Sequence, residues 1–288
     1  MLVSRDDALT PDGVKERVQL RSNVRVWERG AIELRFDRYL DPRTAIRQSY
    51  CLSSDSVKPR SLDECSPAVA TSPAYDPVDR ALVLYLGAPL ESATQYQLTL
   101  FAPPLDEDAD PLTVGLRAFD GVGLERNLTF TFTTAEAPSG ADVEAPPPPP
   151  TCKELDDALE PCQSCHSPRA PAPTNLRLTL DTIDEAVDRV AMGTQRGGEA
   201  TTPQASGPTF GGNMPIIGSR APGNSYLLYK ALAYGTLEPT LEGGETERVR
   251  AWITGFPMPP VGEQEEFQAG NLRTISRYIA AGATCTDE

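Results

Sequence analysis

Apolar and polar residues alternate along four segments in the first half of the chain. These segments are rich in β-branched and aromatic residues, as is typical of strands with one buried face. Turn material such as LDPRT and FDGVG separates them, and no helical pattern intervenes. The pattern predicts an antiparallel β-sandwich, with strands at 31–36, 81–86, 95–100 and 127–134.

In the second half, apolar residues recur at intervals of three and four, which predicts helices. A segment rich in Gly, Pro and Thr, residues 193–215, has little to bury and is expected to be a surface loop. The predicted helices lie at 152–163, 180–192, 224–234, 245–255 and 267–283.

A proline-rich stretch separates the two patterns. Residues 146–150 are five consecutive prolines, which favour a stiff polyproline II spacer of roughly 15 Å. The sequence therefore predicts a β-sandwich domain at 1–136, a linker at 137–150 and a helical domain at 151–288.

The charge of the chain excludes some classes of function. A formal net charge of -15 repels nucleic acid and anionic membrane surfaces. No apolar stretch is long enough to span a membrane, so no transmembrane segment is expected. The N-terminal residues MLVSRDDALTPDG lack the apolar core of an export signal. The chain is therefore either cytosolic or exported with its signal removed.

The segment EPCQSCHSP places Cys162 and Cys165 beside His166, the single histidine of the chain. Three interpretations compete: a redox dithiol, part of a zinc site, or a haem attachment site. Zinc normally needs four ligands, and this half adds only Cys152 and Cys285. A redox dithiol normally follows a strand in an α/β fold. Cys-x-x-Cys-His is the attachment pattern of haem c, in which both thiols bind the haem and the histidine binds its iron.

A thioether sulfur is a common second axial ligand of haem iron. Three methionines of the second half are candidates: Met192, Met214 and Met258. Met192 lies on a predicted helix face, where a core role is expected. Met214 lies in a Gly-rich segment and stays a less favoured alternative. Met258 precedes two prolines in a loop before the last predicted helix, and its alternative role is to fill a gap in the core.

These motifs together resemble class I c-type cytochromes, particularly the larger monohaem type of planctomycetes and myxobacteria. The resemblance covers about residues 152–283 and implies an all-α cytochrome c domain that carries one covalent haem c. It implies that His166 and Met258 are the axial ligands, and that the chain is exported. It further implies that the first and last helices cross, so that Cys152 and Cys285 can form a disulfide. The matching elements are Cys162-x-x-Cys165-His166, APGNSYLLYKAL, Met258-Pro259-Pro260 and residues 272–282.

The first half resembles bacterial Ig-like domains of surface and exported proteins, on the segments IELRFDRYLDPRTA, LESATQYQLTLFA and LTFTFTT. Cys51 and Cys65 flank one loop of this half, and export favours a disulfide over two buried thiols. The acidic loop 106–120 offers oxygen ligands for calcium, but its spacing fits no EF-hand. A solvated turn is the expected role of this loop.

The predicted fold class is therefore an N-terminal all-β Ig-like sandwich joined to a C-terminal all-α cytochrome c domain. The expected function is electron transfer with redox protein partners in the periplasm or on the outer surface, without enzymatic activity. The Ig-like domain is expected to act as a spacer or as a docking module in an envelope complex. The alternatives are a haem-based sensor or peroxidase-like enzyme with an open sixth position, and a surface adhesion protein with a secondary redox role.

Overall fold

The computed structural model describes two compact units. One comprises residues 1–75 and 79–146, and the other comprises residues 76–78 and 147–288. The division between 146 and 147 falls within the proline run. The residues that the structure describes are 3–4, 24–54, 59–104, 115–118, 121–136, 142–167, 178–188, 195–196, 199–200, 214–233, 253, 258 and 269–287.

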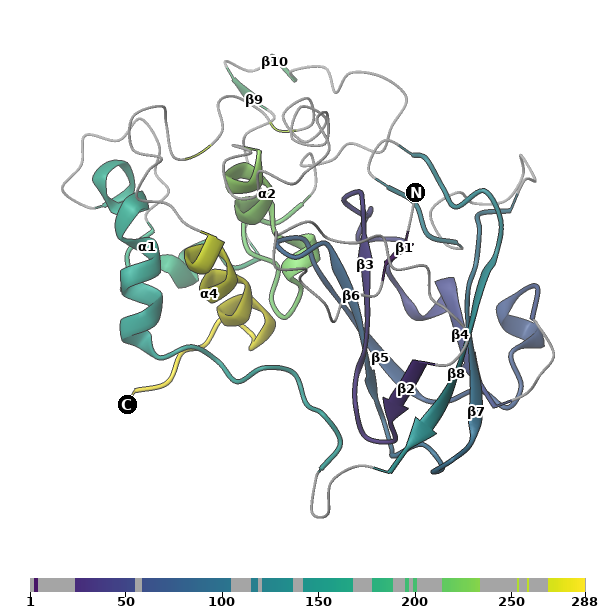
Figure 1. Cartoon of the computed structure of the whole chain (residues 1–288). Coiled ribbons are helices and arrows are strands. Elements are labelled where there is room, and N and C mark those ends of the chain that lie inside the picture. The colour runs from purple at the N-terminus through teal and green to yellow at the C-terminus, as the bar shows by residue number, and fades with distance from the viewer. Residues whose placement is uncertain are drawn as a thin grey trace, which may run out of the picture. The chain divides into compact units, whose positions relative to one another are not determined.

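Two four-stranded sheets form the N-terminal unit (Figure 1). The first has the order β1 (Val3–Ser4), β3 (Ile32–Phe36), β6 (Ala81–Leu86) and β5 (Thr71–Asp76). The second has the order β2 (Val24–Trp27), β8 (Leu128–Ala135), β7 (Gln95–Leu100) and β4 (Tyr50–Ser53). Two short 3-10 helices, η1 (Arg47–Ser49) and η2 (Leu62–Glu64), flank β4 in the sequence.

Both sheets contribute to one hydrophobic core, which makes this unit a β-sandwich compatible with the Ig-like prediction. The alternation in β3 buries Ile32, Leu34 and Phe36 on the same face, as the period of two predicts. Leu82 on β6 and Leu98 on β7 lie in the same core. Side chains from the two inner faces therefore pack together, which stabilises both sheets.

One pair of strands departs from the antiparallel prediction. β2 runs parallel to β8, with Val24 opposite Phe132, whereas β7 pairs with β8 and β4 with β7 in antiparallel fashion. The two parallel strands lie about a hundred residues apart in the chain. No hairpin constrains their relative direction, so the local pattern could not predict it.

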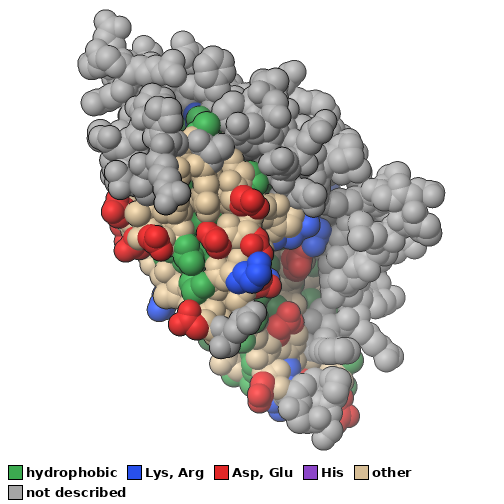
Figure 2. Space-filling model, turned by 90° about the vertical axis from the view of Figure 1, so that its left-hand side faces the viewer, with side chains coloured by type: hydrophobic (Ala, Val, Ile, Leu, Met, Phe, Trp, Pro, Cys, Tyr) green, Lys and Arg blue, Asp and Glu red, His purple; other side chains and the backbone are tan. Residues whose placement is uncertain are grey.

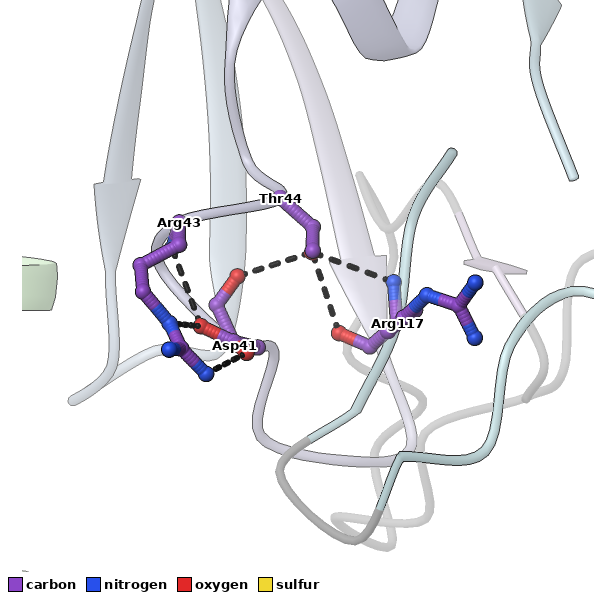
Figure 3. Close-up of polar contacts among 4 residues, drawn as sticks. All are labelled: Asp41, Arg43, Thr44 and Arg117. Atoms are coloured by element: carbon purple, nitrogen blue, oxygen red, sulfur yellow. Dashed lines mark hydrogen bonds and ion pairs between the residues drawn. The ribbon is translucent and has the colours of Figure 1, made fainter. Parts of the chain in front are cut away.

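A polar cluster fixes the turn after β3 (Figure 3). The carboxylate of Asp41 is 5% exposed and accepts hydrogen bonds from the backbone and guanidinium of Arg43. The Thr44 hydroxyl donates to the Asp41 carbonyl at 2.8 Å and accepts from the backbone N–H of Arg117 at 3.1 Å. Because these buried polar groups are hydrogen-bonded, the turn LDPRT is held against residues 115–118 without leaving them unpaired.

Cys51 and Cys65 form the predicted disulfide. It joins β4 to the residue that follows η2. The backbone N–H of Val69 also donates to the carbonyl of Leu52 at 2.8 Å. β4 is the last strand of its sheet, so this linked loop covers backbone groups that an edge strand would otherwise expose.

The C-terminal unit is not the all-α domain that the sequence predicts, so the predicted fold class is wrong. Within the described residues it has three α-helices and a two-stranded antiparallel sheet, and the described chain as a whole is mostly β. The strands β9 (Gln195–Arg196) and β10 (Glu199–Ala200) lie in the segment expected to be a loop. Gly197 and Gly198 separate them, and two adjacent glycines are a hairpin signal within the segment predicted to be a surface loop.

The helices also differ from their predicted bounds. The structure has α1 (Cys152–His166), α2 (Tyr226–Leu232) and α4 (Ala269–Ala280), with 3-10 turns η3 (Ile183–Ala186) and η5 (Pro222–Asn224). The helix predicted at 180–192 is therefore wrong, and η3 is the described helical turn there. After η3, Val187 instead forms a parallel bridge with Ile217. The helix predicted at 245–255 lies outside the described residues, apart from Ile253.

α1 and α4 pack together, and α2 also packs against α4 (Figure 1). The predicted disulfide between Cys152 and Cys285 joins the start of α1 to the residues after α4. Beside it, the backbone N–H of Cys152 donates to the Thr286 carbonyl, and the N–H of Thr286 donates to the Pro150 carbonyl, each at 3.0 Å. The two ends of this unit are thus tied by a covalent link and by backbone hydrogen bonds.

Gly282 ends α4 in a Schellman motif. Its N–H donates to the Ile279 carbonyl, and the N–H of Ala283 donates to the Tyr278 carbonyl, each at 2.9 Å. Gly282 has a φ of +91°, and a Cβ at this position would lie 3.1 Å from Nε of Arg220. Gly270, within the same helix, has open space around its Cβ position.

These two glycines form a matched pair for stability measurements. Gly282→Ala should lower the free energy of unfolding by about 1–2 kcal/mol, because alanine disfavours a positive φ and meets Arg220. Gly270→Ala should raise the free energy of unfolding by about 0.5–1 kcal/mol, because it removes backbone freedom from a helix without a clash. Denaturant unfolding monitored by far-UV circular dichroism measures both. Equal effects of the two substitutions would contradict the Schellman assignment.

Candidate functional site

The first half of α1 is firmly anchored. Its N-cap residue Thr151 accepts a hydrogen bond from the backbone N–H of Glu154, whose carboxylate accepts from the Thr151 N–H in return. This capping box satisfies donors that a helix start leaves unpaired. Glu154 also accepts from Arg277 of α4 at 3.2 Å, and the hydrogen bond from the Thr151 backbone is the main cause that lowers the Glu154 pKa. Leu155 and Leu159 are fully buried.

The second half of α1 carries the cysteine and histidine cluster. Cys162, Cys165 and His166 occupy positions i, i+3 and i+4, which lie on one face of an α-helix. All three residues are half-buried. His166 is the last residue of α1, and its carbonyl accepts from the Leu178 N–H at 2.8 Å. The three candidate ligands therefore share one helix face at the C-terminal end of α1.

The other four cysteines form two disulfides. Cys152 and Cys285 are paired with each other, as are Cys51 and Cys65, whereas Cys162 and Cys165 remain thiols. The disulfide between Cys152 and Cys285 removes the two thiolates that a four-cysteine zinc site would need. Within the described part of the chain, no three His, Cys, Asp or Glu side chains lie close enough to hold a metal ion.

The environment of Cys162 also disfavours the redox dithiol. Burial raises the pKa of Cys162 to about 12, and the neighbouring Cys165 adds to the rise. Redox-active thiols show the reverse, a lowered pKa, which helix N-termini and cationic neighbours produce. Cys162 and Cys165 instead lie near the C-terminal end of α1, where the helix dipole disfavours a thiolate.

Two of the three candidate methionines lie within the described residues, and both lie next to α2. The backbone N–H of Met258 donates to the carbonyl of Lys230 at 3.1 Å, and Met258 is half-buried. Met214 is buried and precedes Pro215, whose carbonyl accepts from the Tyr226 N–H at 2.9 Å. Met214 therefore packs into the core as an apolar side chain. Met192 lies outside the described residues, as does the acidic loop at 106–110 with Asp120.

Acidic side chains are exposed along the part of α1 that precedes Pro161. Glu154, Asp156, Asp157 and Glu160 are exposed on this helix, and Lys153 pairs with Asp157 at 2.6 Å. Figure 2 shows that Asp and Glu side chains are spread over the described part of one face of the molecule. None of the described helices is long and apolar enough to cross a membrane.

Two contacts near the cluster were missed by sequence reasoning. Gln163, between the two cysteines, donates through Nε2 to Oδ1 of Asp156 at 3.0 Å. Asn271 of α4 donates through Nδ2 to the Ala158 carbonyl at 3.4 Å. The spacing of seven residues between Asp156 and Gln163, two turns of one helix, is a signal that could have revealed the first contact. Nothing local in the sequence indicates the second.

Comparison with known proteins identifies no family. No protein-family model matches the chain, and no curated protein matches it. Among solved structures, surface layer protein SbsC, domains 1–6, is 14% identical with a TM-score of 0.28. That match covers 42% of this chain and spans only 14% of the SbsC chain. The copper resistance protein PcoC from Escherichia coli is 21% identical with a TM-score of 0.26, over 40% of this chain and 91% of that chain. Likenesses this weak carry no argument about fold or function.

The raised pKa of Cys162 predicts slow alkylation in haem-free protein with both disulfides formed. The pKa rises from 9.0 to about 12, so iodoacetamide at pH 8 should label Cys162 roughly 30-fold or more slowly in the folded chain than in guanidinium-unfolded chain. Labelling of the folded chain should keep accelerating above pH 9, because the thiol is still protonated there. Peptide mass spectrometry reads the label at Cys162 directly. Equal rates in the two states would restore the redox-dithiol interpretation.

Proposed function

We propose that this chain binds one haem covalently through Cys162 and Cys165 and serves as a single-electron carrier outside the cytoplasm. The observation that carries the proposal is that these two thiols share one helix face with the single histidine, while the other four cysteines are paired. The thiols and the imidazole are the donor set that haem c requires.

Each residue of the cluster has a distinct role in this proposal. The thiols of Cys162 and Cys165 would hold the haem, because each S–H can add across one vinyl group of the haem to give a thioether without a leaving group. His166 would supply an imidazole nitrogen to the iron. The bound haem would supply reversible one-electron chemistry, with a potential that depends on its axial ligands and burial. Because His166 is the single histidine, it leaves no histidine for general acid–base catalysis, which favours a carrier over an enzyme.

Met258 is the favoured second axial ligand. Its backbone bond to Lys230 holds it beside α2, and both α2 and α1 pack against α4. Met214 is the weaker candidate because it is 7% exposed and packs in the core. Pro259 and Pro260 follow Met258 and restrict the backbone of its loop.

Two disulfides and the haem motif together support export, because disulfides persist in oxidising compartments. We place the protein in the periplasm or on the outer surface, where a redox protein is its partner. The net charge of -15 disfavours strongly acidic partners and favours encounter with basic ones. The N-terminal β-sandwich serves as a spacer or docking module.

Covalent attachment can be measured directly. Chain exported together with a c-type haem maturation system should keep one haem after acid–acetone extraction, as a single haem mass added to the intact chain. Cys162→Ser and Cys165→Ser together should abolish that added mass, because both bonds require sulfur. The matched control, Cys51→Ser with Cys65→Ser, should keep the haem. Complete extraction of haem from the unaltered chain would overturn the proposal.

The role of Met258 separates the electron carrier from a sensor or peroxidase. Met258→Ala should open the sixth position, so that the ferrous protein binds carbon monoxide within the mixing time and the reduction potential falls. Met214→Ala is the control and should leave carbon monoxide binding slow. Visible spectroscopy and redox titration provide the two measurements. Rapid carbon monoxide binding by the unaltered protein would favour the sensor or peroxidase function instead.

A further inference from the structure

Pro161 lies inside α1, immediately before Cys162. Proline has no backbone N–H, so it cannot donate to the carbonyl of Asp157 four residues earlier, and its ring crowds that carbonyl. The regular hydrogen-bond ladder of α1 is therefore interrupted at the residue that precedes the haem-attachment motif. An interruption of this kind is a common cause of a helix kink.

The two parts of α1 on either side of Pro161 are held very differently. Residues 152–159 are fixed by the capping box, the disulfide to Cys285 and three buried side chains, which are Leu155, Ala158 and Leu159. After Pro161, the residues whose burial is described are at most half-buried. Segments with little buried apolar surface open at a lower free energy than the core they adjoin.

Two side-chain contacts lie at the interruption. Gln163 donates to Asp156, so it links the residues after Pro161 to those before it. Asn271 of α4 donates to the carbonyl of Ala158, three residues before Pro161. The Asn271 bond therefore ties the anchored half of α1 to α4, whereas the Gln163 bond crosses Pro161. We name the bond Gln163–Asp156 the latch.

We propose that Pro161 is a hinge that lets residues 162–166 open as a unit separate from the anchored first half of α1, and that the latch holds this unit closed. Gln163 is then a positioning residue for the haem-attachment turn. The half-buried thiol of Cys162 becomes accessible to haem in the open state. The hinge is a property of the haem-free chain, whereas its use in haem attachment rests on the proposed function.

Hydrogen exchange of haem-free protein with both disulfides formed tests the hinge. In the unaltered chain, the amides of 162–166 should exchange faster than those of 155–160. Pro161→Ala should slow exchange of 162–166 by about tenfold or more, because alanine restores the donor and favours the helix. Exchange of 155–160 should stay unchanged. A single exchange rate across 155–166, or no effect of Pro161→Ala, would overturn the hinge.

The latch has its own matched set of variants. Gln163→Ala should speed exchange of 162–166 by about threefold to tenfold, the effect of losing one hydrogen bond. Gln163→Lys keeps a donor for Asp156 and should restore the original rate. Lys153→Ala breaks an exposed pair within the anchored half and should leave 162–166 unchanged. If Gln163→Lys fails to restore the rate, or Lys153→Ala matches Gln163→Ala, the latch is wrong.

Haem loading of the same variants separates the hinge from the proposed function. With a maturation system, Pro161→Ala should lower the fraction of chain that carries covalent haem by at least about twofold, because the open state is less populated. If the unaltered chain carries haem but Pro161→Ala does not slow the hydrogen exchange of 162–166, the hinge is refuted and the proposed function is not. If Pro161→Ala slows the hydrogen exchange of 162–166 but the unaltered chain carries no haem, the proposed function is refuted and the hinge is not. Equal haem loading of both chains would refute the role of the hinge in attachment.

Discussion

The disulfide between Cys152 and Cys285 is the constraint on which the described C-terminal helices depend. It closes a loop with a sequence separation of 133 residues and lies where the start of α1 meets the end of the chain. Helices of the length of α1 and α4, 15 and 12 residues, are marginal in water unless they pack against something. The disulfide, the backbone bonds around Thr286 and the packing of α1 on α4 supply that support together.

The same constraint separates two uses of cysteine within one helix. Cys152, at the first turn of α1, is oxidised and structural, whereas Cys162 and Cys165 remain thiols in the last turns. Each structural cysteine has its partner within its own unit. The chemistry proposed for the cluster therefore requires no rearrangement of the disulfides, and the anchored half of α1 supports the half that carries the ligands.

The prediction of an all-α second domain was wrong because the helical pattern was extended too far. In 180–192 the apolar spacing is helical, but over the described residues 180–188 the structure has only the 3-10 turn η3, and Val187 bridges to Ile217. In 195–200 the composition predicts a surface loop, but the structure has the antiparallel pair β9 and β10, which the two adjacent glycines are able to connect. The parallel pairing of β2 with β8 depends on strands distant in sequence, which no local pattern specifies.

The sequence by itself determined the strands β3, β6, β7 and β8, the positions of α1, α2 and α4, and the cluster of Cys162, Cys165 and His166, because these follow from local periodicity and spacing. It also predicted both disulfides, through loop position and family resemblance. The tertiary structure alone decided which carbonyl Asn271 contacts, which methionine is buried and how strongly the Cys162 thiol is desolvated. Those properties depend on which distant residues surround an atom, and burial and hydrogen bonding across the fold are not encoded in any single stretch of the chain.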